Sequence, residues 1–367
     1  MIRTSNDRGH NTLAAEGLTL AQLAQFDDII DVRSPSEFRD DHIPGAVNFP
    51  VLNDEERARV GTIYKQTSAF DAKKIGAALV ARNIADHVER HFADKPKNWH
   101  PLIYCWRGGS RSGAMTHILN QVGWRAQQLK GGYKAYRTMV LATLQTLPGG
   151  FKYRVVCGPT GSGKSRLLAA LDELGAQVLD LEGLAAHRGS ILGNLPDADQ
   201  PSQKMFESRL WEALQQFDPN RPVYVEAESK KIGNIRAPDA LLEEMWQHGQ
   251  CIRVELAQEQ RIALLKEEYV HFLEDPAALC QKLEHLTGLH GKAVIRKWQE
   301  LSTGRAWNEL VEELLVKHYD PAYNKSTAKH YAQYGEALIL LPTDISMEGF
   351  RVAAKQAMLE QEINTLT

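Results

Sequence analysis

The chain has 367 residues, of which 43% are hydrophobic and 24% are charged. These values are typical of a folded globular protein and exclude a disordered acidic one, and the length predicts about two domains. The 43 Lys and Arg against 46 Asp and Glu give a formal net charge of −3. This balance excludes a strongly basic nucleic-acid-binding tail, but a basic patch on a neutral chain could still bind nucleic acid.

The first part of the chain alternates short apolar strands with helices. The predicted elements are strands at 28–32, 46–49 and 102–105, and helices that begin at Pro35 and span 71–92 and 112–122. This alternation is typical of a parallel-sheet α/β domain, which we place at residues 13–146. Pro148, Gly149 and Gly150 then interrupt the pattern and mark the domain boundary.

The second part of the chain repeats the α/β pattern and then becomes helical. The predicted elements are strands at 151–157, 177–181, 223–226, 251–256 and 337–341, a helix at 164–174 and a helical stretch at 258–318. We therefore predict a second α/β domain over residues 151–345, with a helical portion at about 258–335. An amphipathic C-terminal helix is expected over 346–367.

The cysteines and the amino-terminal residues predict the cellular compartment of the protein. Cys105, Cys157, Cys251 and Cys280 form no CxxC pair and need not form disulfides, so a reducing compartment is expected. No run of 18 apolar residues occurs, and residues 1–15 contain no apolar signal core. We therefore predict a cytoplasmic protein without a membrane partner.

One cysteine stands at the end of a predicted strand, before a glycine-rich turn and a helix. Cys105 is followed by Trp106, Arg107, Gly108, Gly109, Ser110 and Arg111. In such a loop the backbone N–H groups can surround an anion, and the helix and the two arginines add positive charge. This environment favours a thiolate, so we predict that Cys105 is reactive and that the loop binds an anion. The other three cysteines are expected to be buried and inert.

A phosphate-binding motif follows the domain boundary. Residues 158–165 fit G-x-x-x-x-G-K-[ST], between a predicted strand and a predicted helix. The predicted diphosphate contacts are Gly158, Thr160, Gly161, Ser162, Gly163, Lys164 and Ser165. Lys164 would reach the terminal phosphate and Ser165 could hold Mg²⁺. The motif alone does not identify the ligand, but the chain has no N-K-x-D motif, which argues against a GTPase.

Four other residues are candidates for the same site. Asp180 and Glu226 end predicted strands, where a second carboxylate usually completes a phosphate-loop site, although either could be a surface residue. His187 and Arg188 lie in a basic, Gly-containing turn that is either an anion contact or a plain loop. We assign no metal site from the sequence.

A basic helical stretch is the candidate surface for binding nucleic acid. Lys292, Arg296, Lys297 and Arg305 surround Trp298, and three tyrosines follow at Tyr323, Tyr331 and Tyr334. Basic groups with interleaved aromatic rings suit phosphate contacts and stacking on unpaired bases. The alternative is a solvated helix face with aromatic residues in the core.

Four segments of the first domain resemble the rhodanese family. They are Asp31–Phe38 (DVRSPSEF), His42–Asn48 (HIPGAVN), the Cys105 loop, and Leu129–Tyr136 (LKGGYKAY). The resemblance implies a rhodanese-like fold and a sulfur-carrying role for Cys105. The usual loop is Cys-x4-Arg, whereas Cys105 and Arg111 are separated by five residues, as in the phosphatase and arsenate-reductase relatives. The longer loop predicts a tetrahedral anion as ligand.

The combination of the two domains resembles the tRNA 2-selenouridine synthase family. Further segments that carry the resemblance are Ala186–Ser190, Val225–Ser229 and His318–Tyr323. The resemblance implies replacement of sulfur by selenium at C2 of 2-thiouridine, at the wobble position of tRNA. In this family the sulfur is first S-geranylated with geranyl diphosphate, and selenophosphate then supplies selenium.

The resemblance also predicts the partners. They are a 2-thiouridine-containing tRNA, bound through its anticodon loop, and selenophosphate, for which a selenophosphate synthetase is a candidate source. No tightly bound cofactor is expected, and Mg²⁺ is a candidate ion. We assign geranyl diphosphate to the phosphate loop, and either selenophosphate or a selenium bound to Cys105 to the Cys105 loop.

Three other functions stay open on the sequence alone. A P-loop kinase or ATPase regulated by the rhodanese-like module would turn over ATP without tRNA. A phosphatase-like enzyme would use Cys105 and Arg111 on phosphate esters. A non-enzymatic sulfur carrier or tRNA-binding adaptor would need neither Cys105 nor Lys164.

Overall fold

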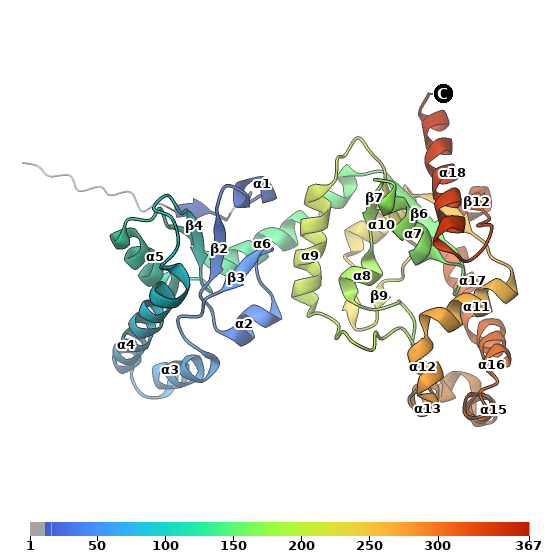
Figure 1. Ribbon diagram of the computed structural model, residues 1–367, viewed down its shortest axis with the longest axis horizontal. Coiled ribbons are helices and arrows are strands. Elements are labelled where there is room, and N and C mark those ends of the chain that lie inside the picture. The colour runs from blue at the N-terminus through green and yellow to red at the C-terminus, as the bar shows by residue number, and fades with distance from the viewer. Residues whose placement is uncertain (1–11, 16, 367) are drawn as a thin grey trace, which may run out of the picture. The chain divides into compact units, whose positions relative to one another are not determined.

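The computed structural model describes residues 12–15 and 17–366 (Figure 1). Most of the amino-terminal segment 1–15, in which we predicted no signal core, lies outside the described residues. The chain forms two compact units, residues 1–144 with 201–216 and residues 145–200 with 217–367. The division differs from the predicted one at residues 201–216, which we expected in the second domain.

The first unit is built on a five-stranded parallel sheet with the order β1-β5-β4-β2-β3. Its strands are β1 (Thr12–Ala14), β2 (Asp28–Asp31), β3 (Ala46–Asn48), β4 (Pro101–Tyr104) and β5 (Gln127–Lys130). All four residues of the central strand β4 are buried. A central parallel strand is covered on both faces, which explains why its sequence is a continuous apolar run.

Helices lie on both sides of this sheet (Figure 1). The helices of the first unit are α1 (Leu20–Leu23), α2 (Pro35–Asp40), α3 (Asp54–Gln66), α4 (Ala69–His87) with a π-helical turn at Val88–Phe92, α5 (Ser110–Val122), α6 (Gly132–Thr143) and α9 (Gln203–Gln216). Ile84 of α4 and Leu119 of α5 pack with Ile30 and Ile103 of the sheet. Helix α3 was not predicted from the sequence. None of its residues is buried, so its sequence lacks the apolar face that would indicate a helix.

Contacts with α6 explain why α9 belongs to the first unit. The ring of Trp211, which is fully buried, lies edge-on to Tyr136 of α6 at 5.8 Å. Next to it, the Arg137 guanidinium forms an ion pair with Glu207 and donates to Ser208 Oγ at 3.2 Å. A sequence pattern cannot reveal this pairing, because about 70 residues separate the partners.

The second unit contains another five-stranded parallel sheet, with the order β12-β11-β6-β8-β7. Its strands are β6 (Tyr153–Cys157), β7 (Gln177–Leu179), β8 (Val223–Glu226), β11 (Gln250–Val254) and β12 (Leu338–Leu340). A two-stranded antiparallel ribbon joins β9 (Lys231–Ile232) to β10 (Ile235–Arg236). The phosphate-loop motif follows the central strand β6, at the sheet edge where ligands bind in open α/β sheets.

The helices of the second unit form two groups. Those near the sheet are α7 (Lys164–Glu173), α8 (Leu181–Ala185), α10 (Asp239–Gln247) and α18 (Met347–Leu366). The helical portion comprises α11 (Gln258–Glu268), α12 (Val270–Glu274), α13 (Pro276–Glu284), α14 (Thr287–His290), α15 (Lys292–Thr303), α16 (Trp307–Leu314) and α17 (Asp320–His330). Short 3-10 or π turns lie at Leu147–Gly150, Leu315–Tyr319 and Ala332–Glu336.

Each group has its own apolar core. Phe350 and Ala354 of α18 pack on Leu167 and Leu171 of α7, and the predicted C-terminal helix is observed up to Leu366. In the helical portion, Trp298 packs with Leu283 and Leu310. The predicted α/β class, with two parallel sheets and a helical carboxyl-terminal portion, is confirmed. Among the described residues, no helix is both long and apolar enough to cross a membrane.

Candidate functional site

The Cys105 loop connects the central strand β4 to helix α5. The Cys105 side chain is buried, and Ser112 Oγ donates a hydrogen bond to its sulfur at 3.2 Å. Gly109 adopts the left-handed conformation (φ 76°) and caps α5, which begins at Ser110, two residues earlier than predicted. The positive end of α5 therefore begins at this loop, as the sequence predicted.

The start of α6 holds the Cys105 loop in place. The Tyr133 N–H donates to Cys105 O at 2.8 Å, and the Lys134 N–H donates to Trp106 O at 2.9 Å. Gly132 makes this approach possible, because its φ is +59° and a Cβ there would lie 2.3 Å from Cys105 O. Close contact with the Cys105 loop thus explains Gly132, whereas the preceding Gly131 (φ +78°) faces Ala135 of α6, 2.6 Å from where a Cβ would lie.

The two arginines of the loop have different surroundings. Arg107 is exposed, whereas Arg111 donates to Glu37 Oε2 at 3.0 Å. Burial raises the pKa of Glu37, but the hydrogen bond and charge of Arg111 outweigh burial and lower it. Glu37 therefore stays ionised and compensates part of the charge that we assigned to Arg111. Trp106 is 42% exposed and its ring lies 5.4 Å from that of Tyr133.

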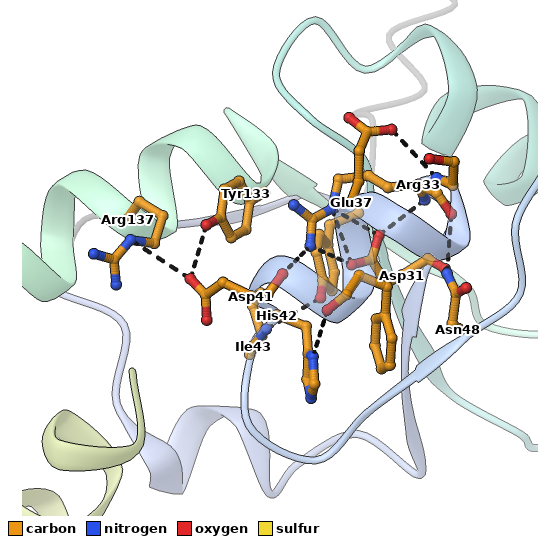
Figure 2. Close-up of polar contacts among 12 residues, drawn as sticks. Asp31, Arg33, Glu37, Asp41, His42, Ile43, Asn48, Tyr133 and Arg137 are labelled. Carbon is orange, nitrogen blue, oxygen red and sulfur yellow. Dashed lines mark hydrogen bonds and ion pairs between the residues drawn. The ribbon is translucent and has the colours of Figure 1, made fainter. Parts of the chain in front are cut away.

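A buried ion pair supports this side of the unit (Figure 2). The Arg33 guanidinium binds Asp31 at 2.6 Å, donates to Asp41 O at 2.6 Å and lies 3.8 Å from the centre of the Tyr133 ring. Asp41 in turn accepts a hydrogen bond from the Tyr133 hydroxyl at 2.8 Å, and Arg137 lies 3.5 Å away. Arg33 and Asp41 therefore position Tyr133 beside Cys105, whereas Glu37 contacts the Cys105 loop directly through Arg111.

The second candidate site is the phosphate loop between β6 and α7. Gly161 (φ +78°) and Gly163 (φ +83°) have left-handed backbones that favour glycine, and Gly163 caps α7. Lys164 Nζ donates to Gly158 O at 2.8 Å, so the lysine folds back over its own loop. Ser162 is fully buried, and its hydroxyl has no hydrogen-bond partner among the residues that the structure describes.

A pocket of 280 Å³ opens beside this loop. Five of the predicted diphosphate contacts line this pocket, together with the predicted carboxylate Asp180. The five are Thr160, Gly161, Gly163, Lys164 and Ser165. His187 and Arg188 also line it, so the basic turn lies at the same pocket as the phosphate loop. Arg188 donates to Glu268 O at 2.5 Å and lies 4.7 Å from the centre of the Tyr269 ring. The structure thus brings the two candidate anion contacts together with the phosphate loop.

The two predicted carboxylates have different positions. Asp180 is exposed and accepts a hydrogen bond from Gly183 N–H at 2.7 Å, which caps α8. Glu226 is only 2% exposed and does not line the pocket. Burial, followed by the charges of Asp180 and Glu182, raises the pKa of Glu226 well above its usual range. Glu226 therefore lies behind the pocket wall, where it accepts a hydrogen bond from the Glu182 N–H at 2.6 Å, and its role as an ion ligand stays a prediction.

Glu182 and Tyr323 belong to the site but were not assigned to it from the sequence. Glu182 lines the pocket and accepts a hydrogen bond from Ser165 Oγ at 3.4 Å. Burial and the charge of Glu228 raise the pKa of Glu182 to about 8. The Tyr323 hydroxyl accepts a hydrogen bond from Gly158 N–H at 2.7 Å. Burial raises the pKa of Tyr323, so this hydroxyl is neutral when it contacts the loop.

Ser165 and Glu182 are the residues that fit a magnesium ion. Mg²⁺ takes oxygen ligands and is usually held by one or two protein groups together with substrate phosphates. The hydroxyl and carboxylate oxygens of this pair face the pocket side by side. Within the described residues, no group of three or more His, Cys, Asp or Glu side chains could hold a metal ion alone.

The basic residues of the candidate tRNA surface are only partly free. Lys292 and Arg296 are exposed one turn apart on α15, and Arg305 is exposed just after it. Lys297 is also exposed but pairs with Glu313 at 3.1 Å. Trp298 is fully buried, and so cannot stack on a base. Of the three tyrosines, Tyr323 contacts the phosphate loop and Tyr331 is buried. Tyr334 is half-buried, with the Arg253 guanidinium 5.2 Å from the centre of its ring. The rings of Trp298 and Tyr331 therefore belong to the core, whereas a stacking role for Tyr334 stays a prediction.

The two family models that match the chain correspond to the two motifs. A rhodanese-like domain model matches residues 16–139, and a model described as the tRNA 2-selenouridine synthase AAA domain matches residues 151–285. The first model contains Cys105 and the second contains the phosphate loop.

Curated relatives match across both parts of the chain. A tRNA 2-selenouridine synthase of Nitrosomonas europaea is 37% identical over 70% of this chain and 66% of its own length. The enzyme of the same name from Marinobacter nauticus is 38% identical over 66% of this chain and 65% of its own length. That of Hydrogenovibrio crunogenus is 32% identical over 82% of this chain and 89% of its own length. The match thus spans just under two thirds of the first two relatives and most of the third.

Proposed function

Because this chain belongs to the tRNA 2-selenouridine synthase family, we propose that it replaces sulfur by selenium at C2 of 2-thiouridine, at the wobble position of tRNA. Within this proposal, the reaction has two steps, S-geranylation and selenium transfer. Each step uses one of the two anion sites described above.

The phosphate loop performs the geranylation. The sulfur on C2 attacks C1 of geranyl diphosphate, a C–S bond forms, the C–O bond breaks, and inorganic diphosphate leaves. Backbone N–H groups of the loop and the Lys164 ammonium stabilise the charge on the departing diphosphate. Lys164 must first release Gly158 O, which it binds at 2.8 Å in this structure. A Mg²⁺ ion, if required, would lie at Ser165 and Glu182 and neutralise part of the same charge.

The Cys105 loop performs the selenium transfer. Alkylation makes C2 electrophilic and converts its sulfur into a leaving group. The loop holds selenophosphate beside Cys105, selenium attacks C2, and the geranylthio group leaves with the electrons of the C–S bond. Cleavage of the P–Se bond by water then releases phosphate.

The observation that carries the proposal is the pair of anion sites on one chain. A P-loop ATPase does not need a buried cysteine in a loop that leads into a helix. A cysteine-dependent phosphatase does not need a phosphate loop. The proposed reaction uses two donors that carry phosphate groups. Geranyl diphosphate, which supplies the geranyl group, would bind one site, and selenophosphate, which supplies selenium, would bind the other.

The remaining parts of the proposal concern partners and location. We propose that Lys292 and Arg296 contact tRNA phosphates and that selenophosphate arrives from a selenophosphate synthetase. No tightly bound cofactor takes part. We place the reaction in the cytoplasm, where all four cysteines would stay as the free thiols that the structure contains.

The test is incubation of the protein with 2-thiouridine tRNA, geranyl diphosphate and selenophosphate, followed by mass analysis of the nucleosides. We expect 2-selenouridine with both donors, S-geranyl-2-thiouridine without selenophosphate, and unchanged 2-thiouridine without geranyl diphosphate. An unchanged nucleoside with both donors, together with ATP turnover in the absence of tRNA, would instead identify a P-loop ATPase.

A further inference from the structure

A second pocket lies next to the phosphate pocket in the second unit. It has a volume of 60 Å³ and lies among the helical portion, where Phe272, Leu279, Leu310, Val311 and Leu314 line it. Three further residues, Thr160, Leu265 and Tyr269, line both this pocket and the phosphate pocket. The two pockets therefore share a wall at the phosphate loop.

Helix α11 forms this shared wall and is packed tightly against the loop. A Cβ at Gly161 would lie 2.9 Å from Leu265 Cδ1, so nothing separates the loop from the leucine. The Arg261 guanidinium donates to Thr160 O at 2.7 Å and pairs with Asp320 at 2.6 Å. Arg261 thus holds the backbone of the phosphate loop against α11, and the two pockets meet at the side chains of Thr160, Leu265 and Tyr269, which line both.

The chemistry of the two pockets differs sharply on either side of this wall. The phosphate pocket presents Lys164, Arg188 and backbone N–H groups, which suit an anion. In the second pocket, Lys266 is the one charged residue of the lining, and the other side chains are almost all aliphatic or aromatic. Water in such a pocket finds few hydrogen-bond partners, so a hydrocarbon group can replace it favourably. A ligand that occupies both pockets has an anionic head and an apolar chain.

We propose that this second pocket, which we call the apolar chain pocket, binds the terminal isoprene unit of geranyl diphosphate and limits the length of the prenyl chain. The inference rests on the proposed function for the identity of the ligand. The diphosphate lies on the phosphate loop, the first isoprene unit runs along Leu265 and Tyr269, and the second enters between Leu310 and Val311.

The size of the pocket supports a limit on chain length. Its 60 Å³ is several times the roughly 10–15 Å³ that one water molecule requires, which leaves room for a small branched group. Leu310, at 1% exposed, and Leu279 close it within the core of the helical portion. A third isoprene unit would have to displace these side chains, so farnesyl diphosphate is expected to bind more weakly than geranyl diphosphate.

The test compares the binding of inorganic, dimethylallyl, geranyl and farnesyl diphosphates to the full chain by calorimetry, without tRNA. Since each buried methylene contributes roughly fourfold to affinity, wild type should bind geranyl diphosphate at least about tenfold more tightly than dimethylallyl diphosphate. The half-buried Val311 allows Val311→Phe to narrow the pocket. This variant should abolish the tenfold preference and leave the affinity for inorganic diphosphate unchanged.

Two further variants complete the test. Leu310→Ala enlarges the pocket and should raise the affinity for farnesyl diphosphate about tenfold, which also tests the inference if Val311→Phe fails to fold. Leu283→Ala is the matched control, because Leu283 is equally buried in the same core but does not line the pocket. Its ligand preferences should equal those of wild type.

The outcomes separate the inference from the proposed function. The apolar chain pocket is refuted if folded Val311→Phe and Leu310→Ala keep the wild-type preferences, or if wild type does not prefer geranyl over dimethylallyl diphosphate. The variants could change the binding preferences as expected while the wild type transfers no geranyl group to 2-thiouridine tRNA. That result would support the apolar chain pocket and contradict the proposed function.

Discussion

Replacement of Gly132 by alanine tests how closely α6 controls the Cys105 loop. Alanine at φ +59° costs about 1–2 kcal/mol in backbone strain. Its Cβ would also lie 2.3 Å from Cys105 O, and a contact below 3.0 Å forces a shift of one backbone segment against the other. That shift weakens the hydrogen bonds from Tyr133 and Lys134 to the loop, worth about 1 kcal/mol each. We expect a total loss of about 3–4 kcal/mol.

Gly45→Ala is the matched control for this substitution. Gly45 has a similar backbone (φ +74°), but a Cβ there meets nothing within 4 Å, so only the strain of about 1–2 kcal/mol applies. Urea unfolding gives the stability of each variant, and nucleoside mass analysis gives the rate of selenium transfer. A displacement of about 1 Å can cost a hundredfold in rate, so Gly132→Ala should be strongly impaired in transfer. The reasoning is refuted if Gly132→Ala matches Gly45→Ala in stability and transfers selenium at the wild-type rate.

Three other predictions concern a buried acid, the contact of α9 and the tRNA surface. Because burial and Glu228 raise the folded-state pKa of Glu182 from 4.5 to about 8, the stability contributed by its protonated form is lost as the pH rises between these values. Glu182→Gln should therefore raise the melting temperature relative to wild type at pH 9 but not at pH 4.5, and an equal effect at both would contradict the assignment. Arg137→Ala leaves the buried Asp41 and the partly buried Glu207 without the cation that pairs with both, and should cost about 3 kcal/mol in urea unfolding. The control is Arg209→Ala at an exposed position of α9, the helix that carries Glu207, which should cost under about 0.5 kcal/mol. Lys292→Ala and Arg296→Ala should each reduce the salt dependence of tRNA binding by about one unit of slope, and slopes equal to that of the exposed Lys355→Ala control would remove them from the tRNA surface.

The backbone geometry of the Cys105 loop and of the phosphate loop could be predicted from the sequence because it is local. In the phosphate loop, Gly163, which the motif requires, and Gly161, at a variable position of the motif, both adopt the left-handed backbone, and Lys164 begins the following helix. In the Cys105 loop, Gly109 provides the corresponding cap of α5. Short-range spacing determines such geometry, so a motif between a strand and a helix is informative without an alignment.

The residues that the sequence did not place depend on long-range packing. Tyr323 contacts the phosphate loop from 165 residues away, and we had assigned it to the tRNA surface. Glu226 ends β8 as predicted, but its side chain points into the protein and is buried behind the pocket wall. The position of a strand end can be predicted from its sequence, whereas the exposure of its last side chain depends on the helices that pack against it.

The central claim is that the two loops divide the two steps, and nucleoside mass analysis of two variants tests it most directly. Cys105→Ala should accumulate S-geranyl-2-thiouridine and form no 2-selenouridine, while Cys280→Ala should behave as wild type. Lys164→Ala should leave 2-thiouridine unchanged but convert tRNA that already carries the geranyl group into 2-selenouridine. Loss of geranylation in Cys105→Ala, together with normal geranylation in Lys164→Ala, would contradict the claim.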